Sequence, residues 1–148
     1  GIGNDMFGPD NSCTRAEIVT FLYRAAGSPE VSKDVVNPFT DVSKDSVYYN
    51  AIMWAVENGI TAGTTKTTFA PNAVCTRAQI VTFLWRANGS ELTAIATRFT
   101  DVPANAYYAD AVAWAVAEGI TAGINTTTFA PDTTCTRAQA VTLIYRAQ

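Results

Sequence analysis

Apolar residues recur at helical spacing in two stretches, one between Asp45 and Gly59 and one between Asn105 and Gly119. The apolar positions are Tyr48, Ile52, Ala55 and Val56 in the first stretch, and Tyr107, Ala111, Trp114 and Ala115 in the second. Residues three and four apart share one face of a helix, so each stretch predicts an amphipathic helix. We expect Asp45 and Asn105 to be the N-caps, and each glycine to follow its helix in a left-handed conformation.

A second kind of helix is predicted at three places: CTRAEIVTFLYRAAGS from Cys13, CTRAQIVTFLWRANGS from Cys75 and CTRAQAVTLIYRAQ from Cys135. Each segment has a threonine followed three residues later by Glu or Gln, which is typical of a capping box at a helix start. The capping pairs are Thr14 with Glu17, Thr76 with Gln79, and Thr136 with Gln139. Apolar residues at helical spacing follow, and Gly27 and Gly89 end the first two segments.

The two kinds of helix alternate in one repeated unit. The three cysteines are 62 and 60 residues apart, and the block FTDVSKDSVYYNAIMWAVENGITAG from Phe39 recurs as FTDVPANAYYADAVAWAVAEGITAG from Phe99. Irregular connectors rich in Gly and Thr join the blocks and contain Phe-x-Pro. We expect their phenylalanines to be buried; these are Phe7, Phe69 and Phe129. The chain therefore divides into a half copy at residues 1–27 and complete copies at residues 38–89 and 98–148.

These repeats predict an all-α fold. A two-helix unit cannot bury its apolar face alone, so the copies must pack on one another. A pseudo-threefold bundle of the three copies is the economical arrangement, and a straight solenoid is the alternative that the sequence leaves open.

Composition and charge argue against several functions. The 148 residues are 48% hydrophobic and 16% charged, which suits a compact fold. A net charge of −3 does not supply the basic face that nucleic acid or an anionic membrane surface requires. No apolar run approaches the roughly 20 residues of a membrane span. The chain has no histidine, the commonest general base and metal ligand, so we expect no enzyme activity and no cofactor.

The three cysteines do not predict a metal site. They lie at equivalent positions of separate copies, with no Cys-x-x-Cys spacing and no histidine nearby, and their odd number argues against a complete set of disulfides. We expect them to be buried as small apolar residues. The chain also opens in the middle of a repeat without an export signal, so we expect it to be a mature or excised part of a larger exported protein.

In their order along the chain, FTDV, Trp-Ala-Val-x-x-Gly-Ile-Thr-x-Gly, Thr-Phe-x-Pro and Thr-Arg-Ala-Glu/Gln resemble the S-layer homology motif. The resemblance implies three motifs in a three-pronged, pseudo-threefold helical bundle at the bacterial cell surface. It also implies attachment to secondary cell-wall polysaccharides, often pyruvylated, in grooves between motifs, with the arginine of Thr-Arg-Ala-Glu as a ligand contact. The chain departs from the family pattern at Tyr48 and Tyr107, where tryptophan is usual, in its Gln and Cys substitutions, and in the missing first helix of the first motif.

Arg15, Arg77 and Arg137 are the most informative candidates for ligand binding. Each follows a helix N-cap, where the positive end of the helix dipole disfavours a cation by about 0.3–1 kcal/mol. A cation placed against this field in all three copies suggests an anionic partner, and guanidinium suits a carboxylate well. The alternative is an ion pair within the chain, for instance with Asp41 or Asp101.

Three further pairs of residues have both a binding and a structural interpretation. Asp41 and Asp101 suit sugar hydroxyls as acceptors, but equally suit capping of the turn that leads into the first helix. Tyr48 and Tyr107 suit stacking on a sugar ring, or core packing. Gly63 and Gly123 suit close approach of the backbone to a ligand, or a left-handed turn.

The leading hypothesis is a non-catalytic module that anchors an exported protein to secondary cell-wall polysaccharide through inter-motif grooves. The alternative is a protein–protein or assembly module of an exported surface protein without sugar binding, in which a helix of another chain completes the half copy. Open polar grooves lined by the arginines would favour the first hypothesis, and paired, occluded arginines the second.

Overall fold

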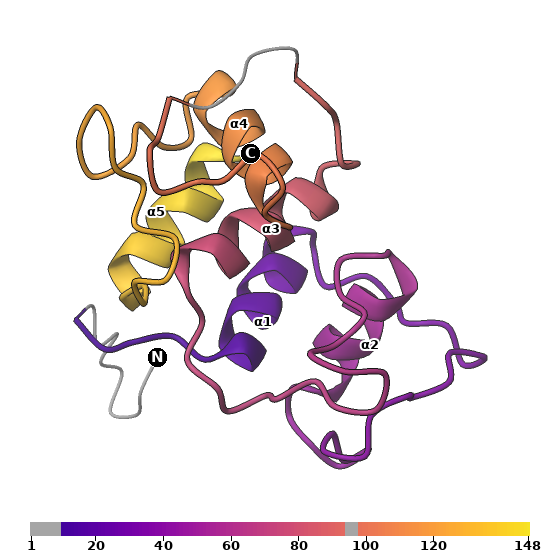
Figure 1. Ribbon diagram of the computed structural model, residues 1–148. Coiled ribbons are helices and arrows are strands. Elements are labelled where there is room, and N and C mark those ends of the chain that lie inside the picture. The colour runs from indigo at the N-terminus through magenta and orange to yellow at the C-terminus, as the bar shows by residue number, and fades with distance from the viewer. Residues whose placement is uncertain (1–9, 94–97) are drawn as a thin grey trace.

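The computed structural model describes residues 10–93 and 98–148, and these residues form five helices (Figure 1). The helices are α1 (Arg15–Ala25), α2 (Tyr49–Glu57), α3 (Arg77–Ala87), α4 (Ala109–Ala117) and α5 (Arg137–Arg146). Apart from isolated bridges, the described residues contain no β-strand, so the predicted all-α class is confirmed. The first connector with Phe7 lies outside the described residues.

The predicted capping boxes are present at α1, α3 and α5. In α1, the Thr14 hydroxyl accepts the backbone N–H of Glu17, and the Glu17 carboxylate accepts the backbone N–H of Thr14. The same reciprocal pair is formed by Thr76 with Gln79 and by Thr136 with Gln139. Two of the N–H groups that a helix start leaves unpaired are thereby satisfied, so these three helix starts are defined by local sequence.

The predicted N-caps Asp45 and Asn105 are wrong, because α2 and α4 begin later. Their N-cap residues are Tyr48 and Tyr108, and neither makes a side-chain cap. The Asp45 backbone N–H is taken by the Ser43 hydroxyl, and hydrogen bonds spanning three residues occupy both segments before the helices begin. Tight turns thus compete with the helix over its expected first turn.

The glycines that were expected to end the helices do so. Each follows a C-cap residue and has a positive φ; the values are 90° at Gly27, 69° at Gly59, 91° at Gly89 and 72° at Gly119. The left-handed conformation reverses the chain after each helix at no steric cost to glycine.

The three copies meet at their cysteines, whose backbones form a closed ring of hydrogen bonds. The N–H of Cys13 donates to the carbonyl of Cys135 (3.1 Å), that of Cys135 to Cys75 (3.3 Å), and that of Cys75 to Cys13 (2.8 Å). The first and third copies would not touch in a straight solenoid, so the ring rules that alternative out. The three-pronged outline expected from the resemblance stays a prediction.

The cysteine side chains are fully buried, as expected from the sequence. Burial raises the pKa of the Cys13 thiol to about 11 and that of Cys75 to about 12, and it raises the pKa of Cys135 as well. These thiols are therefore neutral at physiological pH and act as small apolar side chains. Within the described part of the chain, no cluster of His, Cys, Asp or Glu is suited to a metal ion.

The helices that start at the capping boxes, α1, α3 and α5, contact one another at the centre of the molecule (Figure 1). On the outside, α2 packs against α1 and α4 against α3, so each outer helix covers the inner helix of the preceding copy. Phe69 and Phe129 of the connectors are fully buried, which confirms that expectation for the two described connectors. The connectors are thus anchored beside the first turns of the inner helices.

Candidate functional site

Two equivalent grooves lie where neighbouring copies meet. The first, of about 390 Å³, lies between the start of α1, the connector of the second copy and α3. The second, of about 360 Å³, lies between the start of α3, the connector of the third copy and α5. Both are lined by an arginine at a helix start, a connector glycine, a capping glutamine and an arginine in a last helical turn. These residues are Arg15, Gly63, Gln79 and Arg86 in the first groove, and Arg77, Gly123, Gln139 and Arg146 in the second.

The first arginine of each groove is held by the connector of the next copy. Arg15 donates through Nε to the Phe69 carbonyl (2.8 Å), and its guanidinium carbon lies 4.8 Å from the centre of the Phe69 ring. Arg77 repeats both contacts with Phe129, at 2.9 Å and 4.7 Å. With Nε engaged and an aromatic face beneath, the guanidinium is fixed in orientation within a groove.

Both groove arginines lack a directly bound carboxylate in the described part of the chain. Arg15 is only 5% exposed, and this burial lowers the pKa of its guanidinium. Arginine nevertheless stays protonated near neutral pH. Among residues 10–93 and 98–148, neither Arg15 nor Arg77 makes an ion pair with a carboxylate. Asp41 attracts Arg15, and Asp101 attracts Arg77, without an ion-pair contact. Among the described residues, each groove therefore offers a positioned cation that no carboxylate contacts directly.

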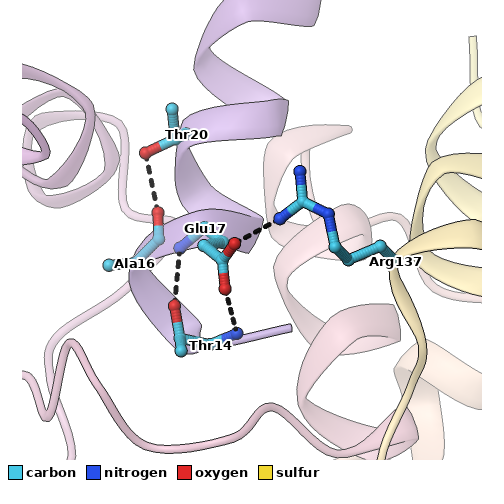
Figure 2. A network of polar contacts seen from close by, with 5 residues as sticks. All are labelled: Thr14, Ala16, Glu17, Thr20 and Arg137. Atoms are coloured by element: carbon cyan, nitrogen blue, oxygen red, sulfur yellow. Dashed lines mark hydrogen bonds and ion pairs between the residues drawn. The ribbon is translucent and has the colours of Figure 1, made fainter. Parts of the chain in front are cut away.

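Arg137 is equivalent in sequence but differs in its surroundings. It is 2% exposed, and its guanidinium forms an ion pair with the Glu17 carboxylate of α1 (Figure 2). The other Glu17 oxygen accepts the Thr14 N–H in the capping box. The sequence suggested Asp41 or Asp101 as internal partners of the arginines, whereas the closed ring of copies brings the start of α5 against Glu17 instead.

Asp41 and Asp101 accept hydrogen bonds from the connectors that hold the arginines. The two Asp41 oxygens accept the N–H groups of Phe69 (2.9 Å) and Ala70 (2.8 Å), and Asp101 does the same for Phe129 and Ala130 at the same distances. Ala70 and Ala130 have φ of 57° and 60°, a strained left-handed conformation for alanine. The carboxylates thus bind the connector 28 residues along the chain, and not the turn before the first helix.

The same contacts predict an acid-sensitive stability. Burial alone would raise the pKa of Asp41 and Asp101. Their hydrogen bonds to backbone N–H groups outweigh this effect, so the pKa of each carboxyl group is lower than in the unfolded chain. A depressed carboxyl pKa stabilises the fold above the unfolded value, about 4, and this stabilisation is lost as pH falls through the folded value. We expect Asp41→Asn and Asp101→Asn each to lower the free energy of unfolding at pH 7 by roughly 1–2 kcal/mol, since both sites are partly solvated.

Urea denaturation of the two variants and the wild type at pH 7 and pH 3 measures this effect. The difference between wild type and each variant should shrink at pH 3, because the aspartates of the unfolded chain are protonated there and folding gains less from the lowered pKa. A difference that is as large at pH 3 as at pH 7 would show that the charge of the carboxylate is not responsible. Asp45→Asn is a matched control, because Asp45 is exposed and takes part in this network with neither oxygen.

The two tyrosine candidates lie in different environments. Tyr107 is 61% exposed, lines the first groove and stands edge-on to Tyr108, with ring centres 5.0 Å apart. Tyr48 is half-buried against the core at the start of α2. The helix starts show why they differ: Tyr108 is the counterpart of Tyr48, whereas the counterpart of Tyr107 is Val47.

Gly63 and Gly123 both line a groove and both have positive φ, 93° and 83°. A Cβ on Gly63 would lie 2.5 Å from Cε1 of Phe39, and one on Gly123 would lie 2.5 Å from Cε1 of Phe99. Turn conformation and close packing therefore both require glycine here.

Sequence reasoning missed the groove positions of Arg86, Arg146 and the capping glutamines. Arg86 and Arg146 each donate to a carbonyl that follows an outer helix, Ile60 and Ile120 respectively, at 3.3 Å. Repetition was the available signal, because every copy carries an arginine nine residues after the first one. The glutamines were assigned only a capping role, because their place in a groove depends on how the neighbouring copy packs.

No helix in the described ranges is both long enough and apolar enough to cross a membrane.

The sequence model of the family described as S-layer homology domain matches residues 1–19, 38–81 and 98–141. The chain is 40% identical over 84 residues to the surface-layer 125 kDa protein of Lysinibacillus sphaericus, covering 57% of this chain and 7% of that protein. It is 29% identical over 154 residues to the cellulosome-anchoring protein of Acetivibrio thermocellus, covering 99% and 34%. It is 38% identical over 87 residues to an endoglucanase of a Bacillus species, covering 59% and 9%. The chain thus spans only a minor part of each of these relatives.

Proposed function

Because the chain belongs to the S-layer homology domain family, we propose that it binds an acidic secondary polysaccharide of the cell wall in the grooves at Arg15 and Arg77. The chain is a cell-wall anchoring module located at the bacterial cell surface.

The observation that carries the proposal is the buried, positioned guanidinium of Arg15, which has no ion-pair partner among the described residues and is matched at Arg77. A planar guanidinium pairs well with a carboxylate through two parallel N–H groups. Because Nε of each arginine is engaged with a backbone carbonyl, the terminal nitrogens are the groups that would face a ligand. A pyruvate ketal on a sugar ring presents a carboxylate of this kind.

The remaining lining suits the sugar that would carry this carboxylate. In the first groove, the Gln79 amide and the Thr64 hydroxyl can exchange hydrogen bonds with sugar hydroxyls. Tyr107 offers an exposed aromatic ring at the edge. The lining of both grooves contains no carboxylate, and the chain contains no histidine, so neither groove has an acid–base pair for glycoside hydrolysis. Open grooves at two arginines that have no ion-pair partner among the described residues favour sugar binding over the assembly alternative.

Binding to pyruvylated wall polysaccharide, before and after mild acid removes the ketals, tests the proposal. We expect the affinity measured by calorimetry to fall at least about 30-fold when the carboxylates are lost, which corresponds to about 2 kcal/mol for the charged contacts. Equal affinity for both preparations would contradict the proposal. A chain that binds neither preparation and forms a stable dimer in light scattering would favour the assembly alternative.

A further inference from the structure

The three arginines at the helix starts face two different kinds of neighbour. Gln79 lines the groove of Arg15, and Gln139 lines the groove of Arg77. Glu17, which is equivalent to these two glutamines, forms the ion pair with Arg137. The arginine is thus constant in all three copies, while the residue that faces it is neutral in two and acidic in one.

The capping box uses only half of this facing side chain. In all three copies Oε1 accepts the backbone N–H of the capping threonine, at 3.0 Å for Glu17, 3.0 Å for Gln79 and 3.1 Å for Gln139. The second terminal atom is what differs between the copies. It is a carboxylate oxygen in Glu17, bound to the Arg137 guanidinium, and an amide nitrogen in Gln79 and Gln139.

The second terminal atom of this Glu or Gln side chain determines whether the facing arginine already contacts a carboxylate. Beside Arg137, an incoming carboxylate would have to displace Glu17 and would meet a like charge at short range, which is unfavourable in a partly buried site. Beside Arg15 and Arg77, an amide N–H is a further donor that favours a carboxylate. The same position therefore repels an anion in one copy and helps to bind it in the other two.

We propose that the residue at the third position of each inner helix selects the grooves that accept an acidic sugar. Gln79 and Gln139 keep the Arg15 and Arg77 grooves open to a ligand carboxylate, and Glu17 acts as an internal carboxylate that occupies Arg137. Of the three equivalent arginines, Arg15 and Arg77 then serve as anion sites and Arg137 does not. This inference rests on the proposed function and adds the residue that sets its specificity.

The chain itself supplies conservative variants for the test. Glutamate and glutamine both complete the capping box, as α1 and α3 show, so exchanging them preserves the helix start. Gln79→Glu and Gln139→Glu place a carboxylate beside Arg15 and Arg77 without altering either arginine. Glu17→Gln makes the opposite exchange in the first copy.

Calorimetry with the methyl glycoside of a 4,6-pyruvylated hexose counts the sites. We expect two sites in the wild type, one in Gln79→Glu or Gln139→Glu, and none in the double variant, with an affinity loss of at least about 30-fold at each altered groove. Glu17→Gln removes the carboxylate that occupies Arg137 and should keep both wild-type sites. Thermal melting checks that every variant is folded.

Three results would overturn the inference: three sites in the wild type, undiminished binding in the double variant, or loss of the two sites in Glu17→Gln. The first two leave the proposed function standing, because the wild type still binds the acidic sugar. A wild type that binds neither this glycoside nor the wall polysaccharide would overturn the proposed function and this inference together.

Discussion

Replacing Arg15 and Arg77 together with glutamine is expected to weaken binding of acidic wall polysaccharide by at least about 100-fold. A hydrogen-bonded charged contact contributes roughly 1.5–3 kcal/mol, or about 10- to 150-fold in affinity at each groove. On a polymer that engages both grooves at once the two losses compound, because the second contact is intramolecular once the first has formed. Each single variant should keep one working groove and lose mainly this avidity.

Surface binding to immobilised polysaccharide measures the loss, and the same variants on the monovalent glycoside separate affinity from avidity. Arg98→Gln is the matched control. Arg98 also donates through Nε to a backbone carbonyl, that of Thr126 (2.9 Å), and lies 5.0 Å from the Phe99 ring, but it lines neither groove. If Arg98→Gln weakens binding as much as the double variant does, general surface charge and not the two grooves is responsible.

Glutamine at position 15 also removes a buried contact to Phe69, so the stability of the variant needs a separate measurement. Arg15→Lys keeps the charge but loses the planar pair of donors. We expect it to bind with intermediate affinity, and its stability is measured as well because the Nε contact to Phe69 is lost here too. Wild-type affinity in the lysine variant would show that charge alone suffices and that paired geometry does not matter.

The sequence predicted the features that depend on neighbouring residues. The capping boxes involve groups three residues apart, so Thr14 and Glu17 define the start of α1 wherever the helix is later packed. The predicted starts of α2 and α4 were wrong for an equally local reason. Tight turns around Ser43 and Pro103 use the backbone groups that a helix would need for its first hydrogen bonds. Capping preferences alone do not decide between two such local structures.

The site was predictable in part. The helix dipole at the chain positions of Arg15, Arg77 and Arg137 pointed to an anion near each of them. The sequence did not identify the anion beside each arginine. Arg137 and Glu17 are 120 residues apart and come into contact only because the three copies pack in a closed ring. The role of Asp41 was missed similarly, since it binds a connector 28 residues away.

Alanine at Gly63 is expected to destabilise the fold by about 2–5 kcal/mol. A left-handed alanine costs about 1–2 kcal/mol. The added Cβ would also lie 2.5 Å from both Cε1 of Phe39 and the carbonyl oxygen of Thr68. Forcing such atoms apart in a packed region typically costs a further 1–3 kcal/mol, roughly. Gly123 faces the same ring and carbonyl contacts in the third copy, from Phe99 and Thr128, and should behave alike.

Gly59→Ala separates the two causes. Gly59 also has a positive φ, 69°, but no atom lies within 4 Å of a Cβ built there, so only the backbone term of about 1–2 kcal/mol applies. Equal losses for Gly59→Ala and Gly63→Ala in urea denaturation would show that the ring contact is unimportant. A larger loss at Gly63 should be accompanied by weaker sugar binding, because the Phe39 ring packs on Phe69, with centres 5.6 Å apart, and the Phe69 carbonyl orients Arg15. The methyl group would then act on the groove through the connector that positions its arginine.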